Sequence, residues 1–262
     1  MLLDLKRRAR RVLRQLRNER WFAAGSTFAE SLPADERIAK CTDRTDNPLR
    51  TFFDRRVQGA GIWKWTHYFD IYHRHLESFR GSAVNVVEVG VYSGGSLDMW
   101  RDYFGIAATI HGVDIAPECR AYEREQIKIS IGDQADPRFW QDFKAKTPSV
   151  DVLIDDGGHT PRQQLVTLRE MLPHLAPGGV YICEDIHGLH NAFATFVYGL
   201  VDHLNSSRTH RDRPGSVPAC GAQTVVESVC FYPFVTVITK TRAPVTEFLA
   251  PKHGTEWQPF LL

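Results

Sequence analysis

The amino-acid sequence predicts an α/β fold in which a mostly parallel sheet of seven strands is covered by helices on both faces. Apolar runs of strand length alternate with helical patterns between residues 84 and 205. Repeated strand–helix–strand units of this length imply a parallel sheet. Two further apolar runs, at 225–232 and 234–240, are separated by Pro233 and favour a final antiparallel hairpin.

The parallel part is predicted to contain five strands, each an apolar run with few charges: 84–91, 109–115, 127–133, 151–155 and 180–185. Apolar spacing and helix-boundary residues predict five helices: 63–79, 96–105, 136–146, 161–175 and 191–205. Asp136 is expected to cap its helix, with Pro137 at the first helical position. Residues 1–60 are predicted to be an extension, with a basic helix over 1–22 and an irregular remainder, and residues 61–262 to be the ligand-binding domain.

Charge is distributed unevenly along the chain. The net charge is +1, but residues 1–20 carry eight Lys or Arg against Asp4 and Glu19, so that this segment is +6 and the remainder −5. An acidic body argues against a nucleic-acid partner. The basic amphipathic helix suits either an anionic membrane or packing against this chain or a partner subunit. We favour packing, so a homodimer is expected and a membrane contact is not.

Cysteine usage and the start of the chain predict a cytoplasmic protein. The five cysteines form no C-x-x-C pair, which excludes a disulfide framework or a zinc site of that kind. The sequence MLLDLKRRARR lacks the long apolar region of a signal peptide.

The residues that follow the first three strands predict an adenosine ligand, because ligands of open α/β sheets bind at the carboxyl ends of the strands. Glycines at 90, 94 and 95 follow the first strand with the spacing G-x-x-x-G-G, which is not the dinucleotide fingerprint. Asp114, after the second strand, is placed to bind ribose hydroxyls, and Asp133 follows the third. The glycine loop contains no Lys or Arg for phosphates, so a ligand without a pyrophosphate fits better.

Paired acids end the next two strands. Asp155 and Asp156 lie at the end of the fourth strand, and Glu184 and Asp185 at the end of the fifth. If the two strands are neighbours, their ends lie about 5 Å apart, and four carboxylates would repel one another. A hard divalent cation such as Mg²⁺, Mn²⁺ or Ca²⁺ would resolve this repulsion. The alternative is that these carboxylates are solvated at the strand ends and bind no cation.

Five motifs then occur in order: E-x-G-x-x-x-G-G-S (88–96), V-D-I (113–115), G-D-Q-x-D-P (132–137), I-D-D-G-x-H (154–159) and P-G-G-x-Y-x-x-E-D (177–185). Together they resemble the metal-dependent class I S-adenosylmethionine methyltransferases that methylate the sugar hydroxyls of macrolides and polyketides. The segment K-W-T-H-Y-F-D-I-Y (64–72) is similar to a lysine/histidine/tyrosine motif of those enzymes. The resemblance covers about residues 60–190, and Gly158 departs from it where the family often has Ser.

This resemblance implies a Rossmann-like fold, S-adenosylmethionine and Mg²⁺ as cofactors, and a sugar hydroxyl of a glycoside or oligosaccharide, such as a methylated mannoside, as acceptor. It implies that Asp156, Glu184 and Asp185 bind the metal and that His159, with Asp156, serves catalysis as the general base beside the metal. The residues expected to bind the cofactor are Lys64, Tyr68, Glu88, Gly90, Tyr92, Ser96, Asp114, Asp133, Gln134 and Asp155.

Three other functions are compatible with parts of the sequence. A catechol-type or other small-molecule O-methyltransferase would use the same metal chemistry. An NAD(P)-dependent oxidoreductase is disfavoured by the missing G-x-G-x-x-G, and a non-catalytic subunit is disfavoured by the intact acid cluster. Trp63, Trp65 and Phe69 are expected to pack, and His187 to be a wall residue of the site.

Overall fold

The structure is a computed structural model that describes residues 19–33, 46–207 and 215–255. The chain divides into two compact units, residues 1–45 and 46–262. In the first unit residues 19–31 are helical, whereas the sequence predicts an irregular segment from residue 23. Thr27 and Ser31 are tolerated there because each hydroxyl donates to a backbone carbonyl about one turn earlier. Most of the predicted helix over 1–22 lies outside the described residues.

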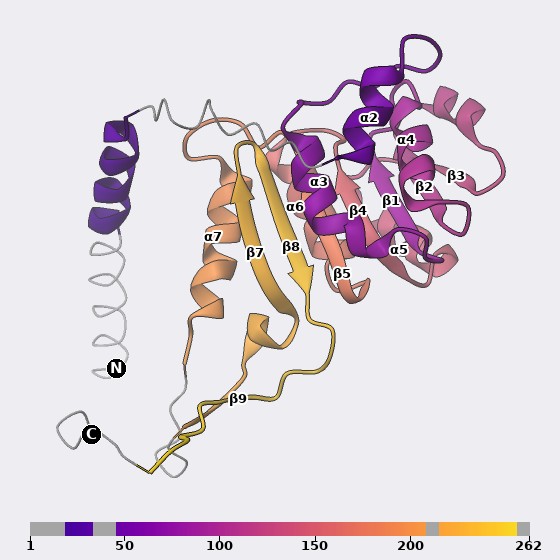
Figure 1. Ribbon diagram of the computed structural model, residues 1–262. Helices are drawn as coiled ribbons and strands as arrows, with labels where there is room; N and C mark the ends of the chain where they lie inside the picture. Colours follow the sequence, from indigo (N-terminus) through magenta and orange to yellow (C-terminus); the bar gives the residue numbers. More distant parts are fainter. Residues whose placement is uncertain (1–18, 34–45, 208–214, 256–262) are drawn as a thin grey trace. The chain divides into compact units, whose positions relative to one another are not determined.

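The second unit is built on a seven-stranded sheet in the order β3-β2-β1-β4-β5-β8-β7 (Figure 1). Its strands are β1 (Asn85–Val89), β2 (Thr109–Asp114), β3 (Ile127–Ile131), β4 (Val150–Asp155), β5 (Leu175–Cys183), β7 (Val226–Tyr232) and β8 (Val235–Lys240). The first five are parallel, and β8 is antiparallel to both β5 and β7. This confirms the predicted Rossmann-like α/β fold and its closing hairpin.

Helices cover both faces of this sheet. They are α2 (Pro48–Arg55), α3 (Tyr68–Leu76), α4 (Gly95–Phe104), α5 (Pro137–Lys146), α6 (Pro161–Met171) and α7 (Ala192–Leu204). Buried residues of α2, α3 and α4 share one core cluster, and those of α5, α6 and α7 share the other. Successive residues of β4 alternate between the two clusters, with Val152 and Ile154 in the first and Leu153 in the second. Burial on both faces explains why the strands read as continuous apolar runs.

The compact unit begins earlier than the predicted boundary at residue 61. Asn47 caps α2 by accepting hydrogen bonds from the backbone N–H groups of Leu49 and Arg50. The Leu49 side chain is fully buried in the first core cluster, so α2 belongs to the folded domain. Asp136 caps α5 as predicted, with Pro137 following it.

Two features differ from the sequence pattern. The helix predicted over 63–79 begins only at Tyr68, which leaves residues 61–65 without helical structure. A separate antiparallel pair, β6 (Ser216–Pro218) with β9 (Glu247–Leu249), was not predicted because three-residue strands are too short to show periodicity. Within the described part of the chain, no helix is long and apolar enough to cross a membrane.

Candidate active site

A cavity of about 920 Å³ opens at the carboxyl ends of the parallel strands. Ligands of open α/β sheets bind at this edge, and sites for small molecules typically measure about 300–1,000 Å³. Eight of the ten predicted cofactor-binding residues line the cavity: Lys64, Tyr68, Gly90, Tyr92, Ser96, Asp114, Asp133 and Gln134. Asp156, His159, Glu184 and Asp185 also line it.

The loop after β1 is shaped by its contact with the end of β4. Gly90 has a φ of 93°, and a Cβ atom at this position would lie 2.0 Å from the backbone oxygen of Asp156. Only glycine therefore allows the loop to pass this close. Oδ2 of Asp114 accepts hydrogen bonds from the backbone N–H groups of Val91 at 2.9 Å and Tyr92 at 3.0 Å, which fastens the loop to β2.

The Asp114 carboxylate remains suited to a ribose. Burial acts to raise its pKa, but hydrogen bonds from three backbone N–H groups outweigh burial and lower the pKa below its usual value. The group is therefore ionised, and a carboxylate has lone pairs beyond those three donors. An acidic acceptor beside a glycine loop, in a cavity of this volume, fits the adenosine part of S-adenosylmethionine.

Glu88 does not line the cavity, although it was predicted to bind the cofactor. Its side chain is fully buried and accepts hydrogen bonds from Ser96 Oγ at 2.6 Å and Trp100 Nε1 at 2.9 Å. Burial raises its pKa, and the nearby Lys64 ammonium opposes that change. Glu88 thus fixes the start of α4, and any effect on a cofactor is indirect.

Asp155 is likewise placed away from the cavity. Its oxygens accept from Gln134 Nε2 at 3.0 Å and Tyr181 Oη at 2.9 Å, and the residue is 1% exposed. Burial raises its pKa to about 6, while the hydrogen bonds from Tyr181 and Gln134 act to lower it. Gln134 in turn accepts from the Gly158 backbone N–H at 2.6 Å. Asp155 therefore supports the loop that carries Asp156 rather than facing a ligand.

Lys64 lies in the inner part of the acid cluster and offsets part of its negative charge. The Nζ atom lies 2.6 Å from Asp156 Oδ2, 3.1 and 3.2 Å from the two carboxylate oxygens of Glu184, and 3.4 Å from Glu88 Oε1. Burial alone would lower the pKa of Lys64, but these three carboxylates raise it well above its usual value. Lys64 thus stays charged and pairs with Asp156 and Glu184, which the resemblance assigned to a metal, and with Glu88, which it assigned to the cofactor.

The outer part of the cluster is organised around Asp185, which has a φ of 54°. Oδ1 of Asp185 accepts hydrogen bonds from Tyr68 Oη at 2.7 Å and Trp65 Nε1 at 3.1 Å. Nε2 of His159 lies 3.5 Å from Oδ2, and Nε2 of His187 lies 3.6 Å from Oδ1. A left-handed conformation is costly for a residue with a side chain, and these contacts hold Asp185 in it.

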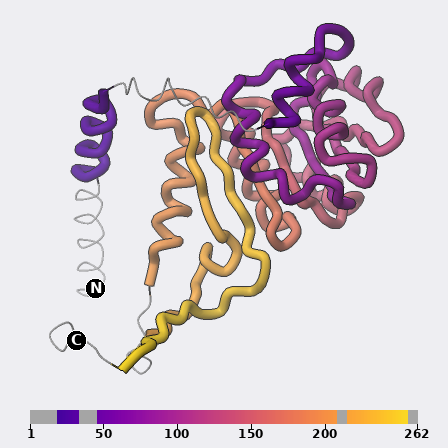
Figure 2. The backbone as a smooth tube through the Cα atoms, viewed as in Figure 1, coloured from indigo at the N-terminus to yellow at the C-terminus, as the bar shows by residue number. Residues whose placement is uncertain are grey.

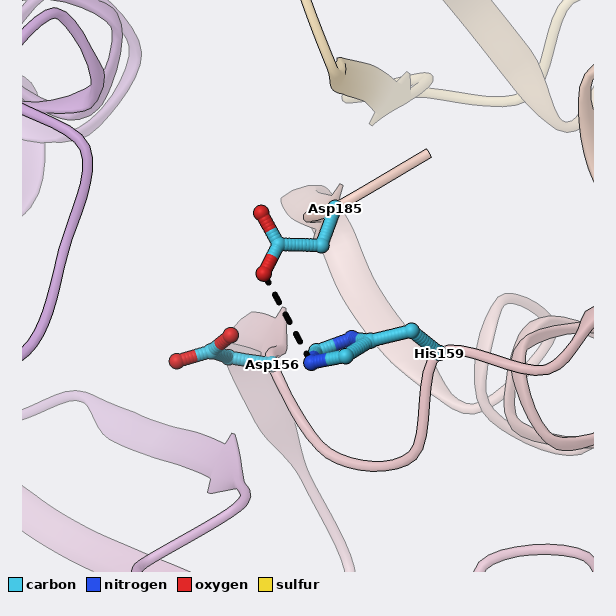
Figure 3. A group of neighbouring side chains, drawn as sticks. All are labelled: Asp156, His159 and Asp185. Carbon is cyan, nitrogen blue, oxygen red and sulfur yellow. Dashed lines mark ion pairs between the residues drawn. The ribbon is translucent and has the colours of Figure 1, made fainter. Parts of the chain in front are cut away.

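Asp156, His159 and Asp185 come together as potential metal ligands (Figure 3). One ligand atom from each lies within 4.8 Å of the other two. Two carboxylates and an imidazole suit a divalent cation, and the carboxylates favour a hard one. The predicted proximity of the β4 and β5 ends is explained by the register, in which Asp155 pairs with Cys183. Glu184 is turned toward Lys64 and is not in this group.

The sequence did not predict that two tryptophan side chains line the cavity. Trp63 and Trp65 were expected to pack, yet they are 88% and 49% exposed and line the cavity. Phe69 is fully buried, as expected. His187 lines the cavity as a wall residue. The sequence offered no signal for the exposed tryptophans, because Trp65, Tyr68 and Phe69 keep helical spacing across the start of α3.

Comparisons with known proteins indicate a methyltransferase. Residues 87–186 match a family described as a methyltransferase domain. The chain is 30% identical over 225 residues, 79% of its length, to the 8-demethyl-8-alpha-L-rhamnosyl tetracenomycin-C 2'-O-methyltransferase of Streptomyces olivaceus, of which this covers 59%. It is 37% identical over 131 residues to the L-olivosyl-oleandolide 3-O-methyltransferase of Streptomyces antibioticus, covering 47% of this chain and 33% of that protein. The chain thus spans less than two thirds of these relatives.

A solved structure shares the fold. The MycE methyltransferase from the mycinamycin biosynthetic pathway, in complex with Mg and SAH, aligns with a TM-score of 0.62 and 24% identity over 78% of this chain and 56% of that one. The strand order, the methyltransferase-domain match and the curated relatives agree with one another. The chain therefore has a methyltransferase fold, its residues 87–186 match a methyltransferase domain, and its sequence is similar to those of O-methyltransferases named for glycosylated acceptors.

Proposed function

We propose that this chain is an S-adenosylmethionine-dependent and divalent-metal-dependent O-methyltransferase that acts on a sugar hydroxyl of a glycoside or oligosaccharide. The observation that carries the proposal is the group of Asp156, His159 and Asp185 at the edge of a cofactor-sized cavity. A methylated mannoside is one acceptor of this class.

The relatives support a sugar acceptor. Two of them are named as O-methyltransferases of a rhamnosyl tetracenomycin and of an olivosyl oleandolide. The MycE structure contains Mg and SAH, the demethylated product of S-adenosylmethionine. A catechol-type acceptor is the alternative, because it too presents vicinal oxygens to a cation.

The cavity residues divide between the two cofactors. The glycine loop with Gly90 and Tyr92 would hold the amino-acid end of S-adenosylmethionine, Asp114 its ribose, and Asp133 with Gln134 its base. Asp156 and Asp185 would hold the cation at the rim. Glu184 can join them only if its ion pair with Lys64 opens.

When bound, S-adenosylmethionine supplies the methyl group, and a divalent cation supplies positive charge that favours ionisation of the acceptor hydroxyl. Nε2 of His159 would take the proton from that hydroxyl, which leaves the oxygen able to accept the methyl group. The carboxylate of Asp185, 3.5 Å from this nitrogen, stabilises the imidazolium that results. The rigid loops after β1 and β4 keep the two reactants aligned, which lowers the entropic part of the barrier.

We further propose a cytoplasmic homodimer in which the methyltransferase domain, which includes α2 and begins at residue 46, is preceded by the basic extension. The basic amphipathic pattern of the extension supports the dimer, and the lack of any C-x-x-C pair among the five cysteines supports a reducing compartment. Light scattering of the purified chain tests the dimer, because a monomer at micromolar concentration would contradict it.

The function is tested by transfer of labelled methyl from S-adenosylmethionine to a panel of glycosides and catechols with Mg²⁺ present. Transfer to a glycoside supports the proposal. Transfer to catechols alone would establish the alternative.

A further inference from the structure

Three half-exposed rings converge beside Asp185 from distant parts of the chain. Trp65 precedes α3, His187 follows β5, and Phe234 lies in the turn between β7 and β8. The ring centroids are 5.5 Å apart for Trp65 and Phe234, 6.2 Å for Trp65 and His187, and 4.5 Å for His187 and Phe234. Trp65 is 49% exposed and Phe234 38%. We refer to these three rings as the aromatic platform.

The pairing of β5 with β8 places the β7–β8 turn beside the other two rings. Cys183 at the end of β5 pairs with Thr236 near the start of β8, so the turn lies at the ligand-binding edge of the sheet (Figure 2). The backbone oxygen of Phe234 accepts from the N–H of Ile186 at 3.0 Å. His67 Nε2 lies 3.1 Å from the Pro233 oxygen. These contacts fasten the turn to the segments that carry the other two rings.

The aromatic platform adjoins the groups that would act on the acceptor. The Trp65 indole donates to Asp185 Oδ1 at 3.1 Å, and His187 Nε2 lies 3.6 Å from the same oxygen. Trp65 and His187 line the cavity together with His159. A ligand that lies on these rings therefore places its edge at the proposed cation and base.

The arrangement of the three rings favours a pyranose over a flat aromatic ring as the acceptor. The three rings are tilted to one another by 41–57° and already pack together, so they present no parallel-walled slot for a flat aromatic ring. A pyranose has an apolar C–H face and a rim of hydroxyls. The C–H face can lie on an aromatic surface that is open on one side, and the hydroxyls can contact the carboxylates beside that surface.

We propose that the aromatic platform of Trp65, His187 and Phe234 binds the acceptor's sugar ring by its C–H face. This inference rests on the proposed sugar O-methyltransferase function and assigns its acceptor subsite. Phe234 is the residue to change, because its ring packs against Trp65, His67 and His187 and does not line the cavity proposed to hold the cofactor.

The test measures the KM for a glycoside that the unchanged chain methylates, and the affinity of that glycoside in the presence of SAH by calorimetry. Phe234→Ala should raise both KM and the glycoside dissociation constant about tenfold or more, with kcat within about twofold and SAH affinity unchanged. Phe234→Tyr should restore binding. The matched control is Phe231→Ala in the same hairpin, which is 43% exposed and packs on Tyr198 instead; it should leave both constants unchanged.

Equal constants for Phe234→Ala and the unchanged chain would overturn the subsite. If Phe234→Ala does not fold, Phe234→Leu keeps the apolar volume of the turn without a ring and is measured in its place. The proposed function fails separately, if the unchanged chain methylates no glycoside.

Discussion

The ammonium of Lys64 lies 2.6 Å from Oδ2 of Asp156, in the middle of the acidic cluster. The same nitrogen is within 3.2 Å of both carboxylate oxygens of Glu184. The protein therefore carries its own cation on the inner side of the cluster. Asp185 and His159 remain on the outer side, where the cavity opens.

Lys64→Met is expected to tighten divalent-cation binding. The ammonium and a divalent cation repel each other and compete for Asp156 and Glu184, so its removal frees three carboxylate oxygens. We expect the Mg²⁺ dissociation constant to fall by about tenfold or more, about 1.4 kcal/mol, in calorimetry without S-adenosylmethionine or acceptor. Lys144→Met, which breaks an ion pair with Glu170 far from the site, is the control. Weaker binding in Lys64→Met would instead show that Lys64 preorganises the carboxylates.

His159→Gln is expected to slow methyl transfer without weakening S-adenosylmethionine binding. Loss of a general base typically costs a factor of about 10²–10⁴ in rate, and His159 reaches the rim without being part of the predicted cofactor contacts. Single-turnover transfer of labelled methyl gives the rate, and calorimetry gives the affinity. His203→Gln, at an exposed position on α7, is the control. A rate equal to that of the control would remove His159 from the mechanism.

Gly90→Ala is expected to destabilise the chain more than Gly81→Ala. Both glycines have positive φ, 93° and 74°, so each alanine incurs a backbone cost of about 1–2 kcal/mol. A Cβ at residue 90 would also overlap the Asp156 backbone oxygen, whereas a Cβ at residue 81 meets nothing within 4 Å. Urea unfolding measures the two free energies. Equal losses would mean that β1 and β4 do not approach each other at this point as described.

The acid cluster shows how far the sequence could lead. The proximity of Asp156 to Glu184 was predictable, because neighbouring parallel strands end at the same edge of the sheet. The pairing with Lys64 was not, since that residue precedes Asp156 by 92 positions and lies outside any regular element. The sequence also could not show that the Asp155 side chain faces away from the cavity. Strand β4 is buried on both faces, so polar and apolar residues do not alternate along it.

The aromatic platform also could not be predicted from the sequence. From its residue type Trp65 is predicted to pack in the core, and Phe234 is predicted to begin a strand. Only the pairing of β5 with β8 brings the β7–β8 turn beside Asp185.

His111 is expected to make the folded state less stable in mild acid. Burial, and then the charge of Lys128, lower the pKa of His111 to about 4, below its usual 6.5. As the pH falls from about 6.5 to 4 the unfolded chain therefore takes up the proton first, and stability falls by up to about 3 kcal/mol. Urea unfolding of the unchanged chain and of His111→Gln should diverge across this range. Parallel pH profiles would contradict the assignment.

The proposed methyl transfer needs both a divalent cation and a sugar hydroxyl. The most direct measurement is labelled methyl transfer to a glycoside in Mg²⁺, in EDTA, and after Mg²⁺ is restored. We predict transfer in Mg²⁺, its loss in EDTA and its recovery when the ion returns. Unchanged turnover in EDTA would contradict the metal-dependent mechanism at the site formed by Asp156 and Asp185.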